Sequence, residues 1–245
     1  MDHAIYTAMG AASAALNRQA VTADNLANLS TPGFRAQIAA YRSFPVVGPT
    51  SETRALVAVS SSGVDSAPGV IESTGRDLDV ALPTDAWLSV ELPDGSEGYT
   101  RNGKIEISSD GALLINNRPL LGEGGPITVQ PQAQLTIASD GTITALGAGD
   151  KPSALAQVGK LKVIKASTED LLHGDDGLFH LSDLTSTTPY TDVNLMPGML
   201  EGSNVSSVRS MVDMIDTARH FEMNMKVIST VDEDERNANQ LLSIS

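Results

Sequence analysis

Apolar side chains recur at helical spacing near the N-terminus, from Ile5 to Leu29, which predicts one long helix. Most of the residues on this apolar stripe are alanine, so the helix buries little apolar area by itself and is marginal in isolation. Thr31 precedes a proline and is therefore disfavoured in helical geometry, while Gly33 permits a positive φ angle. The helix is expected to end in a fixed corner at this point.

A second amphipathic segment lies near the C-terminus, and Asn204 is expected to cap its first turn. Its heptad positions are Met211, Met214, Ala218, Phe221, Met225 and Ile228. A second apolar stripe lies beside them at Val205, Val208, Val212 and Ile215. Two adjacent stripes allow one helix to pack against more than one neighbour, and methionine suits contacts with partners that differ in shape.

The middle of the chain alternates apolar and polar residues, which predicts β-strands. The candidate strands are 79–92, 98–107, 112–116, 126–129, 134–138, 142–146, 158–166 and 177–182. Four dipeptides between them supply the positive φ angles that tight hairpins need, namely Asp94-Gly95, Asn102-Gly103, Asp110-Gly111 and Asp140-Gly141. A β-rich domain of hairpins is therefore expected over 72–185.

These patterns predict an α+β protein in which terminal helices form a coiled-coil assembly domain and extended connectors join them to a central all-β domain. The expected parts are an N-terminal helix and corner (1–45), a connector (46–71), the β-rich domain (72–185), a returning connector (186–202) and a C-terminal helix (203–245). Neither helix has a sequence neighbour to pack on, so each can meet the other or another subunit. That layout is typical of a self-assembling subunit.

Composition narrows the possible functions. The 245 residues are 41% hydrophobic but 4% aromatic, so the core must consist of Val, Leu, Ile and Ala. A formal net charge of −14 disfavours binding to nucleic acid or to an anionic membrane surface. No cysteine is present, which excludes disulfides and thiolate chemistry. The sequence also predicts neither membrane insertion nor a cleaved Sec signal peptide.

A search for chemistry in the sequence predicts no catalytic, cofactor or metal site, and therefore no enzyme. The histidines have no metal-ligand spacing; they are His3, His173, His180 and His220. Asp77, Asp79 and Asp85 lack the glycine and glutamate of a calcium loop, and no nucleotide-binding or nucleophile motif is present. The charged run 232–236 is interpreted as a solvated patch, with anchoring to a basic neighbour as the alternative.

Several motifs resemble the bacterial flagellar rod and hook family, and the resemblance extends over nearly the whole chain. The motifs are "NLANLSTPGFRAQ", "YTRNGKIEISSDGALL" and "LEGSNVSSVRSMVDMIDTARHFEMNMKVIST". The N-terminal "DHAIYTAMGAA" and the short length favour a subunit of the proximal rod. The alternatives are a distal-rod or hook subunit of the same family, or a secreted adhesin or binding module that uses residues 72–185.

The resemblance implies a non-enzymatic subunit of the flagellar basal-body rod, the drive shaft that transmits torque from motor to hook. It implies assembly with copies of itself and with other proximal and distal rod subunits. It further implies export through the flagellar type III apparatus without a cleaved signal peptide, and a location in the periplasm. In such a rod the terminal helices pack as an inner tube and the β-domain faces outward.

The expected assembly interface follows from the helical stripes and from the resemblance. On the first helix and corner it consists of Ile5, Met9, Ala12, Leu16, Asn25, Leu26, Asn28, Leu29, Pro32, Gly33 and Phe34. On the second helix it consists of Met211, Ile215, Ala218, Met225 and Ile228. The resemblance implies that six of these residues form the corner where the helix turns into the connector: Asn25, Leu26, Asn28, Pro32, Gly33 and Phe34.

Overall fold

The computed structural model describes residues 2–45, 55–130, 133–147, 155–174, 176–181 and 188–243. The chain divides into two compact units. The helical unit consists of residues 1–29, 36–65 and 205–245, and the β unit consists of residues 30–35 and 66–204. The α+β class expected from the sequence is confirmed.

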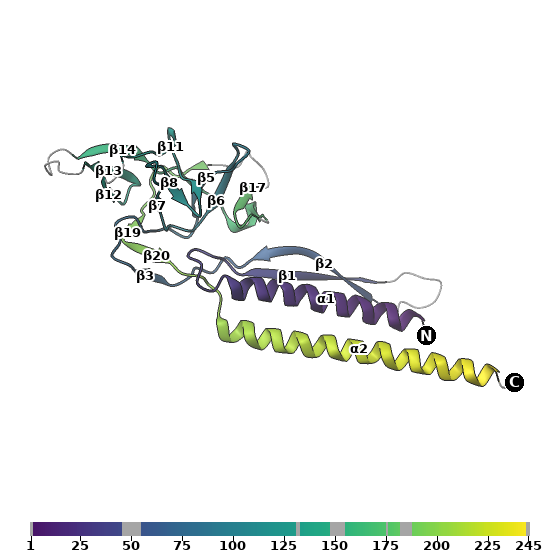
Figure 1. Ribbon diagram of the computed structural model, residues 1–245. Helices are drawn as coiled ribbons and strands as arrows, with labels where there is room; N and C mark the ends of the chain where they lie inside the picture. The colour runs from purple at the N-terminus through teal and green to yellow at the C-terminus, as the bar shows by residue number, and fades with distance from the viewer. Residues whose placement is uncertain are drawn as a thin grey trace. The chain divides into compact units, whose positions relative to one another are not determined.

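The helical unit contains α1 (Asp2–Ala27) and α2 (Ser207–Ser243). The N-terminus of α1 and the C-terminus of α2 lie at the same end, so the two helices pair in an antiparallel sense (Figure 1). The helix α2 has 37 residues against 26 in α1, and it runs on past the start of α1 (Figure 1). The sequence left two possible partners for each helix, the other helix or another subunit. In the structure the two terminal helices pack against each other within one chain.

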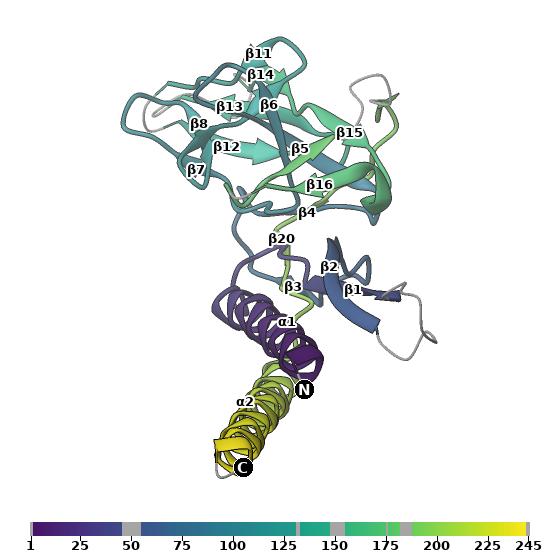
Figure 2. The same ribbon diagram turned by 90° about the vertical axis from the view of Figure 1, so that its right-hand side faces the viewer.

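A β-hairpin completes the helical unit. Its strands β1 (Gln37–Pro45) and β2 (Ala55–Val64) pair in antiparallel register. The Tyr41 hydroxyl donates a hydrogen bond of 3.0 Å to the Ala14 carbonyl oxygen, and α1 lies between α2 and the hairpin (Figure 2). The sequence indicated a connector over 46–71, so the strand β2 was missed; residues 46–54 of that connector lie outside the described residues.

The end of α1 is tied to the start of β1 by one side chain. The Asn25 Nδ2 donates to the Gln37 carbonyl oxygen at 2.9 Å, and the Gln37 N–H donates to Asn25 Oδ1 at 2.8 Å. The Asn28 Nδ2 donates to the Asp24 carbonyl oxygen at 3.0 Å, which satisfies one of the last carbonyl groups of the helix. The two asparagines expected at the corner thus have distinct local hydrogen-bonding roles.

The β unit is built on one six-stranded antiparallel sheet. In spatial order its strands are β16 (Leu171–His173), β17 (Phe179–Leu181), β6 (Glu97–Thr100), β5 (Ala86–Glu91), β15 (Val163–Lys165) and β18 (Thr188–Pro189). A short 3-10 helix, Thr168–Asp170, precedes β16.

Smaller antiparallel sheets and ladders complete the β unit. One three-stranded sheet contains β12 (Gln134–Ile137), β13 (Thr142–Leu146) and β14 (Ala156–Lys160), and another contains β7 (Glu106–Ile107), β8 (Leu113–Ile115) and β9 (Arg118–Pro119). The two-stranded ladders join β10 (Leu121–Gly122) to β11 (Gly125–Pro126), β4 (Val80–Ala81) to β19 (Met196–Pro197), and β3 (Ile71–Ser73) to β20 (Met199–Glu201). The returning segment, expected to be a connector, therefore carries strands of this unit.

Three of the four predicted turn glycines have positive φ angles; these are Gly95, Gly111 and Gly141. Gly103 is different, because an added Cβ atom would lie 1.7 Å from the Val80 carbonyl oxygen. The backbone there needs close approach to β4 rather than a left-handed turn. The turn between β8 and β9 was not predicted; there Asn116 and Asn117 have φ angles of 51° and 63°.

The core of the β unit consists almost wholly of buried Val, Leu, Ile and Ala side chains, as the low aromatic content predicted. The single tryptophan, Trp87, is buried on β5 and donates its indole N–H to the Ala166 carbonyl oxygen at 3.1 Å. Within the described residues, no helix is long and apolar enough to cross a membrane. The same residues contain no group of three or more His, Cys, Asp or Glu side chains placed to hold a metal ion.

Candidate assembly interface

Small and hydroxyl-bearing side chains form the seam between α1 and α2. The buried members of this seam are Ala8, Ala12, Ala15 and Thr22 on α1, and Ser210 and Thr217 on α2. They recur at steps of three, four or seven residues, so each set forms one helical face at heptad spacing. Because these side chains are small, the seam buries little apolar area and contributes little hydrophobic stabilisation.

Polar atoms at the seam are satisfied within each helix. The Thr22 hydroxyl donates to the Arg18 carbonyl oxygen at 2.9 Å, and the Thr217 hydroxyl donates to the Asp213 carbonyl oxygen at 2.6 Å. The ion pair between Arg18 and Asp213 crosses the seam at 3.7 Å. Its side chains are about half exposed, and such a pair contributes little to stability.

Several large apolar side chains of both helices are exposed and do not pack in the seam. On α1, Tyr6, Met9 and Leu16 are more than half exposed. On α2, seven residues are between 46% and 72% exposed: Val208, Met211, Val212, Ile215, Met223, Met225 and Val227. Five of them share one helical face, and we call these five the outer stripe: Val208, Met211, Val212, Ile215 and Met223. Gathered apolar side chains on a surface are typical of protein–protein contacts.

The predicted interface residues of the helices therefore fall into two groups. Met9, Leu16, Leu29, Met211, Ile215 and Met225 are exposed. Ala12 is buried in the seam, whereas Ile5, Leu26, Ala218 and Ile228 are half-buried. The seam on α2 runs through the buried Ser210 and Thr217, and the predicted heptad positions Met214, Phe221 and Ile228 are half-buried on the same helical face. The heptad therefore located this face only in part, because its fully buried members carry hydroxyl groups.

The last three predicted corner residues, Pro32, Gly33 and Phe34, belong to the β unit. Gly33 has a φ angle of +69°, and an added Cβ atom would lie 2.4 Å from the Arg101 carbonyl carbon. The Gly33 N–H donates to the Glu201 carbonyl oxygen at 2.7 Å, and the Phe34 ring meets the His173 ring edge-on at 6.5 Å. The predicted positive φ angle is confirmed, and a close backbone approach adds a second reason for glycine.

The predicted helix cap at Asn204 is wrong. The helix α2 begins at Ser207, and the Asn204 Nδ2 instead donates to the Ala67 carbonyl oxygen at 2.9 Å. The Asn204 N–H also donates to the Phe34 carbonyl oxygen at 3.3 Å. The Asn204 side chain therefore bonds the segment at Ala67, while its backbone N–H bonds the corner at Phe34.

Glu201 is the centre of a buried ionic cluster in the β unit. Its Oε1 lies 2.8 Å from the Arg35 guanidinium and accepts a 2.9 Å hydrogen bond from the Gly69 N–H. Its Oε2 accepts hydrogen bonds of 2.5 and 2.9 Å from Arg101. The remaining Arg101 donors reach the carbonyl oxygens of Leu82, Pro83, Thr84 and Ala86. This cluster was not predicted from the sequence, because its three charged residues are far apart in the chain and share no local pattern.

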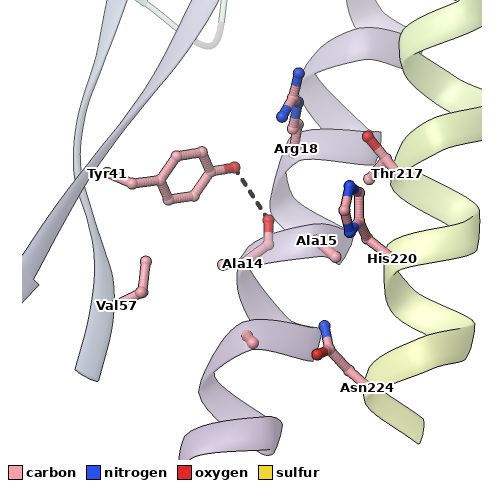
Figure 3. A pocket seen from close by; sticks show the side chains of 9 residues that line it. Ala14, Ala15, Arg18, Tyr41, Val57, Thr217, His220 and Asn224 are labelled. Atoms are coloured by element: carbon pink, nitrogen blue, oxygen red, sulfur yellow. Dashed lines mark hydrogen bonds between the residues drawn. The ribbon is translucent and has the colours of Figure 1, made fainter. Parts of the chain in front are cut away.

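A groove of about 420 Å³ lies in the helical unit, between α1, α2 and the hairpin. Figure 3 shows its lining side chains: Ala11, Ala14, Ala15, Arg18, Tyr41, Val57, Thr217, His220 and Asn224. The α1 side of the groove is mostly alanine. The polar groups gather toward α2, with Arg18 projecting from α1 beside them (Figure 3).

A helix pair with an exposed apolar stripe, combined with a compact β unit, is typical of a subunit that assembles with others. Family models match the N-terminal helix, the β unit and the C-terminal helix. The model "Flagella basal body rod protein" matches residues 5–35. The "Flagellar hook protein FlgE/F/G D1 domain" matches residues 81–145, and the "Flagellar basal body rod FlgEFG protein C-terminal" matches residues 196–241.

Full-length relatives narrow the assignment. The chain is 54% identical to the flagellar basal-body rod protein FlgF of Salmonella typhimurium (strain LT2) and 55% identical to that of Escherichia coli (strain K12), in each case over all of both chains. It is 28% identical to FlgG of Buchnera aphidicola from Acyrthosiphon pisum, over 90% of this chain and 92% of that protein. The chain belongs to the FlgF family of flagellar basal-body rod proteins. It is a structural, non-enzymatic rod subunit.

Proposed function

We propose that this rod subunit assembles with copies of itself and with other axial subunits through the outer stripe of α2 and the exposed apolar residues of α1. This proposal rests on a difference in side-chain size between two faces of each helix. The seam within the chain uses small side chains, such as Ala12 and Thr217, while large ones such as Met211 and Ile215 remain exposed. Burying the large side chains against neighbours would supply the stabilisation that the seam lacks.

In the assembled rod, the helix pair joins neighbouring helices as a coiled coil. The seam already has heptad spacing on both helices, which is the spacing of coiled-coil packing. Val208, Met211, Val212 and Ile215 repeat at three or four residues on the opposite face of α2, so α2 can contact a second helix on that side. The methionines of this stripe adapt to neighbours that differ in shape, as a rod of several related subunits requires.

The subunit then acts in the periplasm as part of the shaft that transmits torque from motor to hook. It is exported through the flagellar type III apparatus without a cleaved signal peptide. The absence of cysteine supports this route, because a chain without thiols passes between reducing and oxidising compartments unchanged.

Deletion of the gene in a motile host tests the proposal. The expected result is the loss of hooks and of swimming, restored by the wild-type chain. A version with Met211→Ser and Ile215→Ser should be expressed and folded but should fail to restore motility. Normal swimming without the chain would contradict the proposal. Immunogold labelling of isolated basal bodies would then separate a proximal position on the rod from a distal-rod or hook position.

A further inference from the structure

The groove of the helical unit offers hydrogen-bond donors that its own chain leaves largely unused. The Arg18 guanidinium lies 3.7 Å from Asp213, which is longer than a hydrogen bond. Within the described part of the chain, the His220 ring and the Asn224 amide make no hydrogen bond or ion pair. The walls are aliphatic or aromatic, from the alanines of α1 to the Tyr41 ring. Such a site suits a carboxylate on an apolar stem.

Arg18 directs its charge into this groove. Burial raises the pKa of the Tyr41 phenol, and the nearby Arg18 charge partly offsets that rise. The two side chains therefore share one electrostatic environment at the groove, next to the hydrogen bond between the Tyr41 hydroxyl and Ala14 (Figure 3). An anionic group entering here would meet a guanidinium at close range.

The last turns of α2 carry the opposite charge. Asp232, Glu233, Asp234 and Glu235 are consecutive, and Arg236 pairs with Asp232 at 2.7 Å. Within the described residues, Glu233, Asp234 and Glu235 make no ion pair. This run lies where α2 reaches and passes the start of α1 (Figure 1). Its carboxylates therefore have little of α1 opposite them.

We propose that the acidic end of α2 in one copy, Asp232–Glu235, docks at the Arg18–His220 groove of a second copy. The contact cannot form within one chain, because His220 and Glu235 are about 22 Å apart along the same helix, at roughly 1.5 Å per residue. Complementary charge on one chain that cannot meet itself indicates contact between copies. This inference rests on the proposed assembly function and gives it a specific pair of surfaces.

The cysteine-free chain permits a direct test by disulfide cross-linking in cells that lack the chromosomal gene. Two full-length variants, Ala14→Cys and Ala238→Cys, are produced together, oxidised, and separated on a non-reducing gel. Both substitutions leave the proposed charged residues intact. The expected product is a covalent dimer between the two variants, which disappears when either variant is produced alone. Ala11→Cys replaces Ala14→Cys if that variant impairs swimming.

Charge reversal provides a second, independent test of the docking. Arg18→Glu in the Ala14→Cys chain should lower the dimer yield roughly tenfold, as should Glu233→Arg with Glu235→Arg in the Ala238→Cys chain. Combining the two charge reversals should restore the dimer yield. Ser109→Cys, an exposed position on the β unit, replaces Ala14→Cys as the matched control and should give no dimer with Ala238→Cys. If motile cells contained no dimer, the proposed docking would be wrong although the proposed rod function would stand. A dimer whose yield did not change with either charge reversal would lead to the same conclusion.

Discussion

Arg101 and Glu201 are separated by 100 residues in the sequence, yet their side chains form a hydrogen-bonded ion pair of 2.5 Å with almost no exposure to solvent. Glu201 also pairs with Arg35 through its other oxygen. One carboxylate therefore balances two buried guanidinium groups that arrive from distant parts of the chain. The Glu201 side chain on β20 therefore joins two distant segments: the end of the corner segment, through Arg35, and the residues that follow β6, through Arg101.

Glu201→Gln should strongly destabilise the β unit. The substitution keeps the size of the side chain but leaves two buried cations without a counter-charge, and breaking a buried pair in this way costs about 3–5 kcal/mol. Chemical denaturation followed by Trp87 fluorescence measures the loss. Glu72→Gln, at an exposed position on β3, is the matched control and should change the free energy of unfolding by less than about 0.5 kcal/mol. Equal effects of both substitutions would contradict the role of the cluster.

Gly33→Ala and Gly75→Ala form a matched pair. Their φ angles are +69° and +67°, so both substitutions carry a similar backbone strain of about 1–2 kcal/mol. An added Cβ atom meets the Arg101 backbone at 2.4 Å in the first case and nothing within 4 Å in the second. Gly33→Ala should therefore lower the thermal midpoint of the β unit clearly more than Gly75→Ala. Identical melting curves would show that the corner does not pack closely on Arg101.

Ala15→Leu should destabilise the helical unit of the free chain. Ala15 is buried in the seam, and extra methylenes in a packed contact cost about 1–3 kcal/mol. The loss of helical circular dichroism on heating measures the effect. Ser13→Leu, at an exposed position on the same helix, provides the control and should leave the transition in place. If Ala15→Leu abolished swimming with no change in melting, the alanine face would pack against other subunits instead of α2.

Tyr99 should ionise well above the ordinary pH range of a tyrosine side chain. Burial, together with the negative charge of Glu97 and the hydrogen bond to it, raises the pKa of Tyr99 to about 12. The folded state therefore holds this proton more tightly than the unfolded chain, whose tyrosines ionise near pH 10. Its contribution to stability is complete below about pH 10 and is lost as the pH rises through 12. Alkaline titration of phenolate absorbance should show a late step that Tyr99→Phe removes; a single step near pH 10 in folded protein would contradict this.

The sequence predicted the two helices and most of the hairpin turns because their signals are local. Helical spacing marks α1 and α2, and the Asp-Gly dipeptides mark turns such as that at Gly141. The hairpin of β1 and β2 was missed because the serines and glycine near the end of β2 resemble a linker. The packed face of α2 was predicted only in part: Met214, Phe221 and Ile228 of the heptad are half-buried there, but the fully buried Ser210 and Thr217 carry no apolar signal. The Glu201 cluster depends on contacts across the fold, which no local pattern encodes.

Thiol labelling of Met211→Cys shows whether the outer stripe is buried in the assembled rod. Met211 is 53% exposed in the single chain, and the protein contains no other thiol. We expect the cysteine of Met211→Cys to react rapidly with a maleimide in purified free protein and in denatured basal bodies. In intact basal bodies from swimming cells it should react slowly. Equal reactivity in intact and denatured basal bodies would show that the stripe remains exposed and would contradict the account.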